Sequence, residues 1–195
     1  MNSLFDFIIK PKENRYTNTK KVSNTNLILN TDTSDHRYVS REAVVISEPK
    51  NNVINVTKGD NIIVHHNIFR RFYDVHGVEK NSKSYFKDDM YFCDPSQVFF
   101  NITTNTAIKN YCFIQPIVKN QGIILEQESE EPLKGIVVYT DNESFIEKND
   151  LVGFTPESEY EFIINGKRLY RVPIKSISIK YERKGTEVEY NPSWL

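Results

Sequence analysis

Few residues of this chain have the types and spacing that catalysis or metal binding requires. His65 and His66 are adjacent, so on a strand their side chains point to opposite faces and cannot share one metal ion. The same alternation separates Asp88 from Asp89, which argues against a paired general acid and base. The seven glycines are scattered and form no phosphate-binding loop. The sequence therefore predicts no catalytic residue, no metal site, no cofactor and no enzyme activity.

One aliphatic triplet, Leu27-Ile28-Leu29, stands in a long polar stretch over residues 11–40, where Val22 and Val39 are the other aliphatic residues. Burying so few apolar side chains cannot offset the conformational entropy that this segment would lose on ordering. We therefore expect a mobile loop over about residues 11–41. A lone triplet in a mobile loop is typical of a docking element that becomes ordered in an apolar groove of a partner. An ordinary core strand is the alternative interpretation of these three residues.

The chain repeats one order of apolar segments. In the first copy the landmarks are an apolar strand at 7–10, the triplet at 27–29, a second strand at 43–46 and a Gly-Asp strand opener at 59–60. In the second copy they lie at 116–119, 122–125, 135–138 and 149–150. Each copy is long enough to close its own core, so the repeat predicts two tandem domains. The threonine-rich stretch 103–106 is the expected boundary.

Short runs rich in Ile, Val, Phe and Tyr alternate with turn residues, which is typical of β-sandwiches and β-barrels. We expect strands at 61–66, 84–93, 97–102, 160–164 and 174–181, and no long helix. Asn165-Gly166 stands between two apolar runs and predicts a β-hairpin with a type I′ turn, since that turn needs positive φ at both central residues.

This order of elements resembles the co-chaperonin family, the GroES-like lids of chaperonin cages. In that family a Val-Ile-Val-Lys strand precedes a mobile loop with an Ile-Val-Leu triplet, and a Gly-Glu-Val strand and a Val-Gly-Asp-Ile-Val strand follow. The matching segments here are Phe7-Ile8-Ile9-Lys10, Leu27-Ile28-Leu29, Arg41-Glu42-Ala43-Val44 and Gly59-Asp60. The resemblance covers about residues 5–182. It implies an all-β chain of two tandem small barrels, 1–106 with the mobile loop and 107–182 with a shortened loop, before a tail at 183–195.

The resemblance also implies a function. Leu27, Ile28 and Leu29 would dock into the apical groove of a chaperonin ring, whose own ATP cycle drives capture and release. The chain would form a homo-oligomeric ring, and we expect seven chains because the unequal loops make the two domains non-interchangeable. The second triplet, Ile123-Ile124-Leu125, lies in a shorter acidic loop and is either a barrel strand or a secondary contact. The rival hypothesis is a non-enzymatic structural protein, such as a virion or assembly component built from the same barrels.

Two segments depart from the family pattern. Residues 69–78 alternate aromatic and Arg side chains where the family has a short Tyr-Gly-Val segment, which predicts either a cavity lining or subunit interface, or a longer β-hairpin. The tail ends in Trp194-Leu195, and we expect it to pack on a neighbouring domain or subunit because an apolar terminus is unfavourable in water.

Composition limits the partners and the compartment. A net charge of −1 gives no electrostatic reason to bind nucleic acid or a membrane surface. Residues 1–6 do not resemble a secretory leader and no apolar run reaches the ~20 residues of a membrane span, so we expect a cytoplasmic protein. Abundant Asn and scarce Gly suggest an AT-rich genome and, with the irregular loops, a phage protein in the host cytoplasm. Cys93 and Cys112 fit no metal-binding spacing and predict two reduced, buried thiols.

Overall fold

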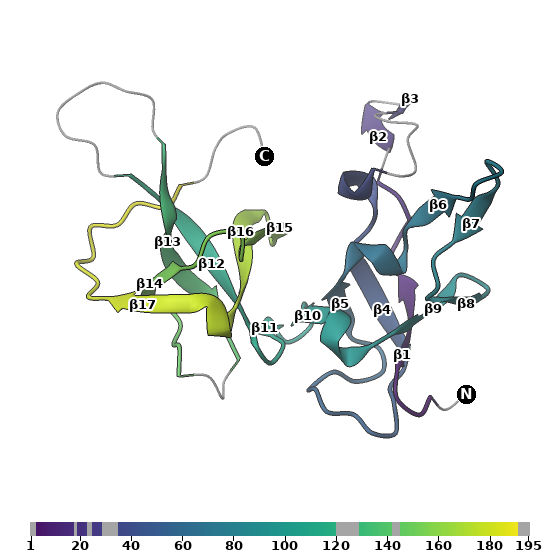
Figure 1. The fold of residues 1–195 in the computed structure, drawn as a ribbon, viewed down its shortest axis with the longest axis horizontal. Coiled ribbons are helices and arrows are strands. Elements are labelled where there is room, and N and C mark those ends of the chain that lie inside the picture. The colour runs from purple at the N-terminus through teal and green to yellow at the C-terminus, as the bar shows by residue number, and fades with distance from the viewer. Residues whose placement is uncertain are drawn as a thin grey trace. The chain divides into compact units, whose positions relative to one another are not determined.

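The computed structural model describes residues 3–17, 19–22, 25–28, 35–119, 129–141 and 145–190, with the backbone alone for 19–22 and 26–28. The chain divides into two compact units, Met1–Asn105 and Thr106–Leu195 (Figure 1). This division falls in the threonine-rich stretch at which the sequence places the domain boundary.

The prediction of an all-β chain is confirmed. In the described residues the helical segments are 3₁₀ turns: η1 (His36–Tyr38), η2 (His66–Ile68), η3 (Pro95–Gln97) and η4 (Ile174–Ser176). The first unit contains β1 (Phe7–Pro11), β2 (Thr19–Val22), β3 (Thr25–Ile28), β4 (Glu42–Ser47), β5 (Asn61–Val64), β6 (Arg71–Tyr73), β7 (Glu79–Asn81), β8 (Tyr85–Lys87), β9 (Met90–Cys93) and β10 (Val98–Asn101). The second contains β11 (Thr106–Ala107), β12 (Tyr111–Val118), β13 (Glu130–Tyr139), β14 (Leu151–Phe154), β15 (Tyr160–Ile164), β16 (Lys167–Pro173) and β17 (Ile177–Tyr181).

Both units contain a main antiparallel sheet with the same strand order. In the first unit the order is β10-β5-β4-β1-β9-β8, and in the second it is β17-β14-β13-β12-β16-β15. Equivalent strands also follow one another in the same order along the chain. The sequence repeat is therefore visible as a repeat of topology. That each sheet closes into a GroES-like barrel stays a prediction.

The strand registers match residue by residue. Ile9 pairs with Val45 in the first unit and Ile114 pairs with Val137 in the second, and a β-bulge precedes both Ile9 and Ile114. Strand β1 therefore corresponds to residues 112–116. The sequence landmark at 116–119 was four residues too far along the chain, because one short apolar run resembles another until cross-strand partners fix the register.

Several predicted strands differ at their ends. The run 84–93 is a hairpin of β8 and β9, because Asp88 and Asp89 adopt positive φ in the turn between them. The runs 61–66 and 174–181 are shortened by 3₁₀ turns, and 97–102 is shortened to β10. The strand at 160–164 is confirmed. So is the hairpin at Asn165-Gly166, where both residues have positive φ and Ile164 pairs with Lys167.

The core of each unit lies on its main sheet. In the first unit the fully buried side chains include Phe7, Ile9, Ile62 and Phe100. In the second unit one cluster consists of Cys112, Ile114, Val137, Ile146, Val152, Phe154 and Val172. Both cysteines are buried and free, as the sequence predicts. Among the described residues, no helix has the length and apolar character needed to cross a membrane.

Candidate functional site

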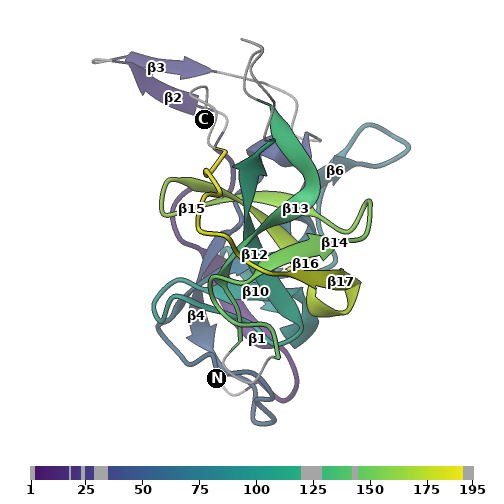
Figure 2. The same cartoon turned by 90° about the vertical axis from the view of Figure 1, so that its left-hand side faces the viewer.

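The segment that joins β1 to β4 carries the first triplet. Strands β2 and β3 pair with each other from Thr19–Ile28 to Val22–Thr25, in a sheet of their own (Figures 1 and 2). Leu27 and Ile28 lie on β3, whereas Leu29 lies outside the described residues. Strand β3 and its partner β2 therefore form a separate ribbon outside the main sheet. The interpretation of the triplet as an ordinary core strand would instead place β3 in the main sheet.

The ends of this segment form an antiparallel stem. Thr17 N donates to Tyr38 O at 2.8 Å, Ser40 N donates to Arg15 O at 3.0 Å, and Tyr16 and Val39 form a β-bridge between them. The Val39 side chain is buried. The two ends of the predicted loop over residues 11–41 are therefore paired with each other. That the segment between them is mobile stays a prediction.

Arg15 attaches the stem to the chain between β5 and β8. Its guanidinium donates to Phe69 O, to Arg70 O at 3.2 Å and to Asn81 Oδ1 at 2.6 Å. It also lies over the Tyr91 ring, 5.3 Å from the ring centroid. Burial lowers the pKa of Arg15, and burial raises the pKa of Tyr91. One Arg side chain can bind three acceptors because its planar guanidinium donates hydrogen bonds in several directions at once.

A tyrosine makes the second attachment. Arg71 N donates to the Tyr16 hydroxyl at 2.7 Å, and the Arg71 guanidinium lies 5.9 Å from the centroid of the Tyr16 ring. Neither Arg15 nor Tyr16 was recognised from the sequence. Their partners lie more than 50 positions away, with sequence separations of 54 and 55, and no local spacing indicates such contacts.

Three imidazoles, from η1 and from the start of η2, lie close together. The rings of His65 and His66 stack with centroids 4.4 Å apart, and His36 lies 5.1 Å from His66. The sequence-based placement of His65 and His66 on opposite faces was wrong, because β5 ends at Val64 and a 3₁₀ turn begins at His66. Burial, together with the nearby charges of His65, Arg41, His36 and Arg70, lowers the pKa of His66 to about 4.

The segment that joins β12 to β13 is at the equivalent place in the second unit. Its base is closed by the pair Val118–Glu130 and by Lys119 N, which donates to Ser129 O at 2.8 Å. The triplet Ile123-Ile124-Leu125 lies outside the described residues. Beside the base, Arg168 forms ion pairs with Glu130 and Glu161, each at 2.8 Å. An arginine thus lies beside the loop base in both units.

The tail runs along the second unit. Val118 N donates to Val188 O, Tyr190 N donates to Pro116 O, and the buried Gln115 donates from Nε2 to Tyr190 O at 3.2 Å. Residues 188–190 of the tail therefore pack on the second unit of their own chain, and the expectation for the apolar end of the tail stays a prediction. Trp194 and Leu195 lie outside the described residues.

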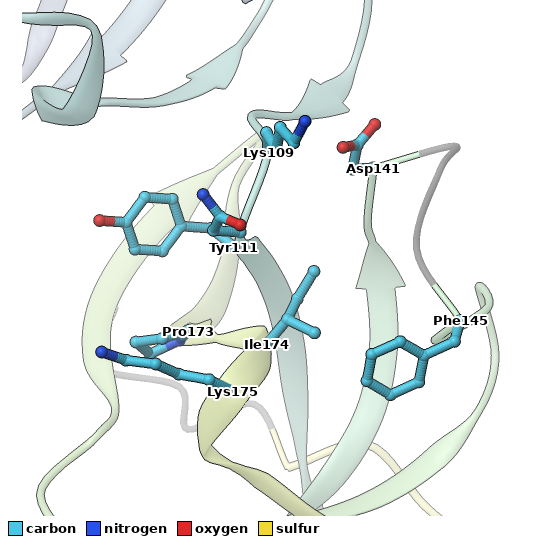
Figure 3. A pocket seen from close by; sticks show the side chains of 8 residues that line it. Lys109, Tyr111, Asp141, Phe145, Pro173, Ile174 and Lys175 are labelled. Carbon is cyan, nitrogen blue, oxygen red and sulfur yellow. The ribbon is translucent and has the colours of Figure 1, made fainter.

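A shallow pocket of about 690 Å³ lies on the second unit (Figure 3). Ile174 lies between the rings of Tyr111 and Phe145, and Asp141 is the one carboxylate in the lining. The lining residues are Lys109, Asn110, Tyr111, Asp141, Phe145, Pro173, Ile174 and Lys175. They include no His, Cys or Ser, and no group of three potential metal ligands occurs in the described part of the chain. The lining residues therefore include no Ser–His or Cys–His pair.

No protein-family model matches the chain, and no curated protein matches it.

Proposed function

We propose that this chain is a co-chaperonin that caps a chaperonin folding cage. The observation that carries the proposal is the position of β3, which bears Leu27 and Ile28, pairs with β2 outside the main sheet and stands on a fixed stem. A short aliphatic segment held outside a core is suited to enter an apolar groove of a partner. The order of landmarks around it resembles that of the GroES-like lids, and the repeated topology supports two tandem domains.

The energetics favour a ring of chains. Burying three aliphatic side chains contributes about 5–8 kcal/mol gross, and ordering the segment costs about 2–5 kcal/mol of it. One contact is therefore weak and readily released. Several copies in one ring bind tightly together, because each bound copy raises the effective concentration of the next. We propose a homo-oligomeric ring of seven chains on a chaperonin ring, with ATP hydrolysed by the partner.

A structural virion or assembly protein is the second candidate. The stem and the β2–β3 pairing order part of the segment without any partner. A first loop ordered by its own chain favours this candidate, whereas a mobile one favours the lid. Both candidates are non-enzymatic. They differ in whether the chain binds a chaperonin.

The test is co-sedimentation with a purified GroEL-like chaperonin and ATP, using the wild-type protein, Ile28→Asp and the matched control Thr25→Asp on the same strand. A charge in an apolar groove costs several kcal/mol per site, on the order of 2–7, so Ile28→Asp should no longer sediment with the chaperonin. Its melting temperature should equal that of the control. A wild-type protein that never binds the chaperonin, or an Ile28→Asp protein that melts early, contradicts the docking role.

The ring has its own test. Native mass spectrometry should give mainly seven-chain assemblies, and a population of monomers and dimers under assembly conditions contradicts the ring. The second triplet is proposed as a secondary contact, so Ile124→Asp should weaken chaperonin binding less than Ile28→Asp does.

A further inference from the structure

The short turn η2 is the place where the stem is attached to the first unit. Phe69 ends η2, and its carbonyl accepts from the Arg15 guanidinium of the stem, as does the carbonyl of Arg70. The side chains of Ile68 and Phe69 are fully buried, so the far side of η2 is fixed in the core. The position of the stem therefore depends on whether η2 keeps its shape.

The imidazole of His65 caps the N-terminus of η2. Its Nδ1 accepts from Asn67 N at 3.1 Å, and its ring packs edge-on against Phe99. Only a neutral imidazole has a nitrogen that can accept a hydrogen bond, because a protonated one carries N–H donors at both positions. Uptake of a proton by His65 therefore removes this cap.

His66 joins η2 to η1. Its ring stacks on that of His65 with centroids 4.4 Å apart, and its centroid lies 5.1 Å from that of His36 on η1. Turn η1 ends at Tyr38, whose carbonyl accepts from Thr17 N at 2.8 Å across the stem. The contact between His36 and His66 therefore lies two residues from a bond that closes the stem.

Cationic side chains face this cluster. Arg41 and Arg70 both oppose a positive charge on His66, and so do His36 and His65 when they are protonated. Together with burial, which is the largest cause, these charges lower the pKa of His66 to about 4. The closed arrangement of η1 and η2 thus disfavours the protonated ring.

The carboxylates on the neighbouring elements have partners of their own. Asp35, at the N-terminus of η1, pairs with Arg37 at 2.7 Å. On the other side of η2, Asp89 accepts from the Tyr91 hydroxyl at 2.9 Å, and Arg15 lies over the same Tyr91 ring. In the described part of the chain, the charges that act on His66 come from imidazoles and guanidiniums.

We propose that His36, His65 and His66 form an acid-sensitive latch, a contact between η1 and η2 that keeps the stem closed at neutral pH and lets it open in mild acid. Protonation of His65 removes the cap of η2. Protonation of His66 places like charges against Arg41 and Arg70, so that η1 separates from η2 and the bonds across the stem break. The latch acts on the stem whatever the segment binds, so it goes beyond the proposed function and does not rest on it.

The direction of the effect follows from linkage. In the open stem the rings are in water, where a histidine has a pKa of about 6.5, whereas the closed stem holds the pKa of His66 near 4. The open stem therefore takes up a proton at higher pH than the closed one does. Closure is favoured in full above pH 6.5 and is weakened as the pH falls towards 4.

The experiment is residue-resolved hydrogen exchange of the full chain at pH 7 and pH 5, without urea and with a low concentration of it. The amides of Thr17 and Ser40 bond across the stem and report its opening, and the Val45 amide on β4 reports the main sheet. Protection of the two stem amides should fall at least about fivefold at pH 5. Low urea should leave their exchange unchanged, because local opening exposes little surface, whereas it should accelerate exchange at Val45.

The test variant is His65→Asn/His66→Gln, in which asparagine keeps an acceptor for the cap and neither side chain titrates. Its stem amides should be protected equally, within about twofold, at both pH values. Protection of Val45 at pH 7 checks that the variant is folded. The matched control is His76→Gln, which changes an exposed histidine between β6 and β7 and should keep the wild-type fall. Each single change, His65→Asn or His66→Gln, should reduce the fall.

Wild-type stem amides that are equally protected at both pH values overturn the latch, and this result needs no variant. Stem amides that exchange only through urea-sensitive unfolding, together with Val45, overturn it as well. So does a folded His65→Asn/His66→Gln protein that loses stem protection in acid as the wild type does. Because none of these measurements uses a chaperonin, their outcome leaves the proposed function to its own test.

Discussion

Asp60 and Asp150 hold the same turn in the two units. Asp60 Oδ2 accepts from Thr57 N at 2.8 Å, and Asp150 Oδ2 accepts from Glu147 N at 2.9 Å. Each aspartate also donates its own N–H to the carbonyl of the same residue three positions earlier. The Asp that the sequence marks as the strand opener is therefore the cap of a repeated turn that sets the register of the following strand.

The two aspartates differ in their second partner, which predicts unequal effects of mutation. Asp60 accepts from Nδ2 of the buried Asn101 at 2.9 Å, whereas Asp150 pairs with the exposed Lys180 at 2.8 Å. Asp60→Ala leaves a buried donor without this acceptor and should cost about 2–3 kcal/mol. Asp150→Ala should cost about 1 kcal/mol, since an exposed ion pair contributes little. Urea unfolding of each variant measures the difference, and equal losses would contradict the assignment.

Gly135 faces the backbone of β12 so closely that a methyl group does not fit. An added Cβ would lie 2.6 Å from Cγ2 of Ile114 and closer still to the carbonyl oxygen of Gln115. Gly135→Ala should therefore destabilise the protein by about 2 kcal/mol or more. The equivalent residue in the first unit is Ala43, which pairs with Pro11 as Gly135 pairs with Pro116. Ala43→Gly is the control and should cost about 1 kcal/mol. A Gly135→Ala protein as stable as wild type in urea would refute the clash.

His66 should make the first unit sensitive to mild acid. Its pKa in the folded protein is about 4, below the ordinary 6.5, so the unfolded chain takes up a proton at higher pH than the folded protein does. The stabilisation is complete above pH 6.5 and is lost as the pH falls towards 4. For a half-buried ring the loss between pH 7 and pH 5 should be about 1 kcal/mol. Chemical denaturation at both pH values measures it, and His66→Gln should flatten the dependence. An equally steep dependence in that variant would assign the effect to groups other than His66.

Removing residues 188–195 should destabilise the second unit. The deletion takes away the bonds between the tail and residues 116–118, and the amide of the buried Gln115 loses Tyr190 O as its acceptor. The expected loss is about 2–3 kcal/mol, with the first unit unaffected. Hydrogen exchange resolved by residue separates the two units. Deletion of residues 191–195 alone is the control, and a chain cut before residue 188 that exchanges like the control would show that the tail adds nothing.

The sequence by itself determined the fold class and the repeat. Alternating apolar runs, the Asn165-Gly166 turn and the Gly59-Asp60 opener are local patterns, because turn geometry and strand alternation depend on residues a few positions apart. Asn165-Gly166 lies in the expected hairpin, and Asp60 and Asp150 lie in equivalent turns.

The tertiary structure decided what depends on contacts between distant segments. Only cross-strand pairing shows that β1 corresponds to residues 112–116, since every apolar run there satisfies the same pattern. The pairing of the stem was not predicted, because Arg15, Tyr16 and Val39 look like ordinary loop residues until their partners are in place. The stacking of His65 on His66 and the packing of the tail on the second unit were not predicted for the same reason: they depend on distant partners. Whether a polar segment is held against the fold or extends into water depends on contacts with distant residues. Its neighbours in sequence do not specify those contacts.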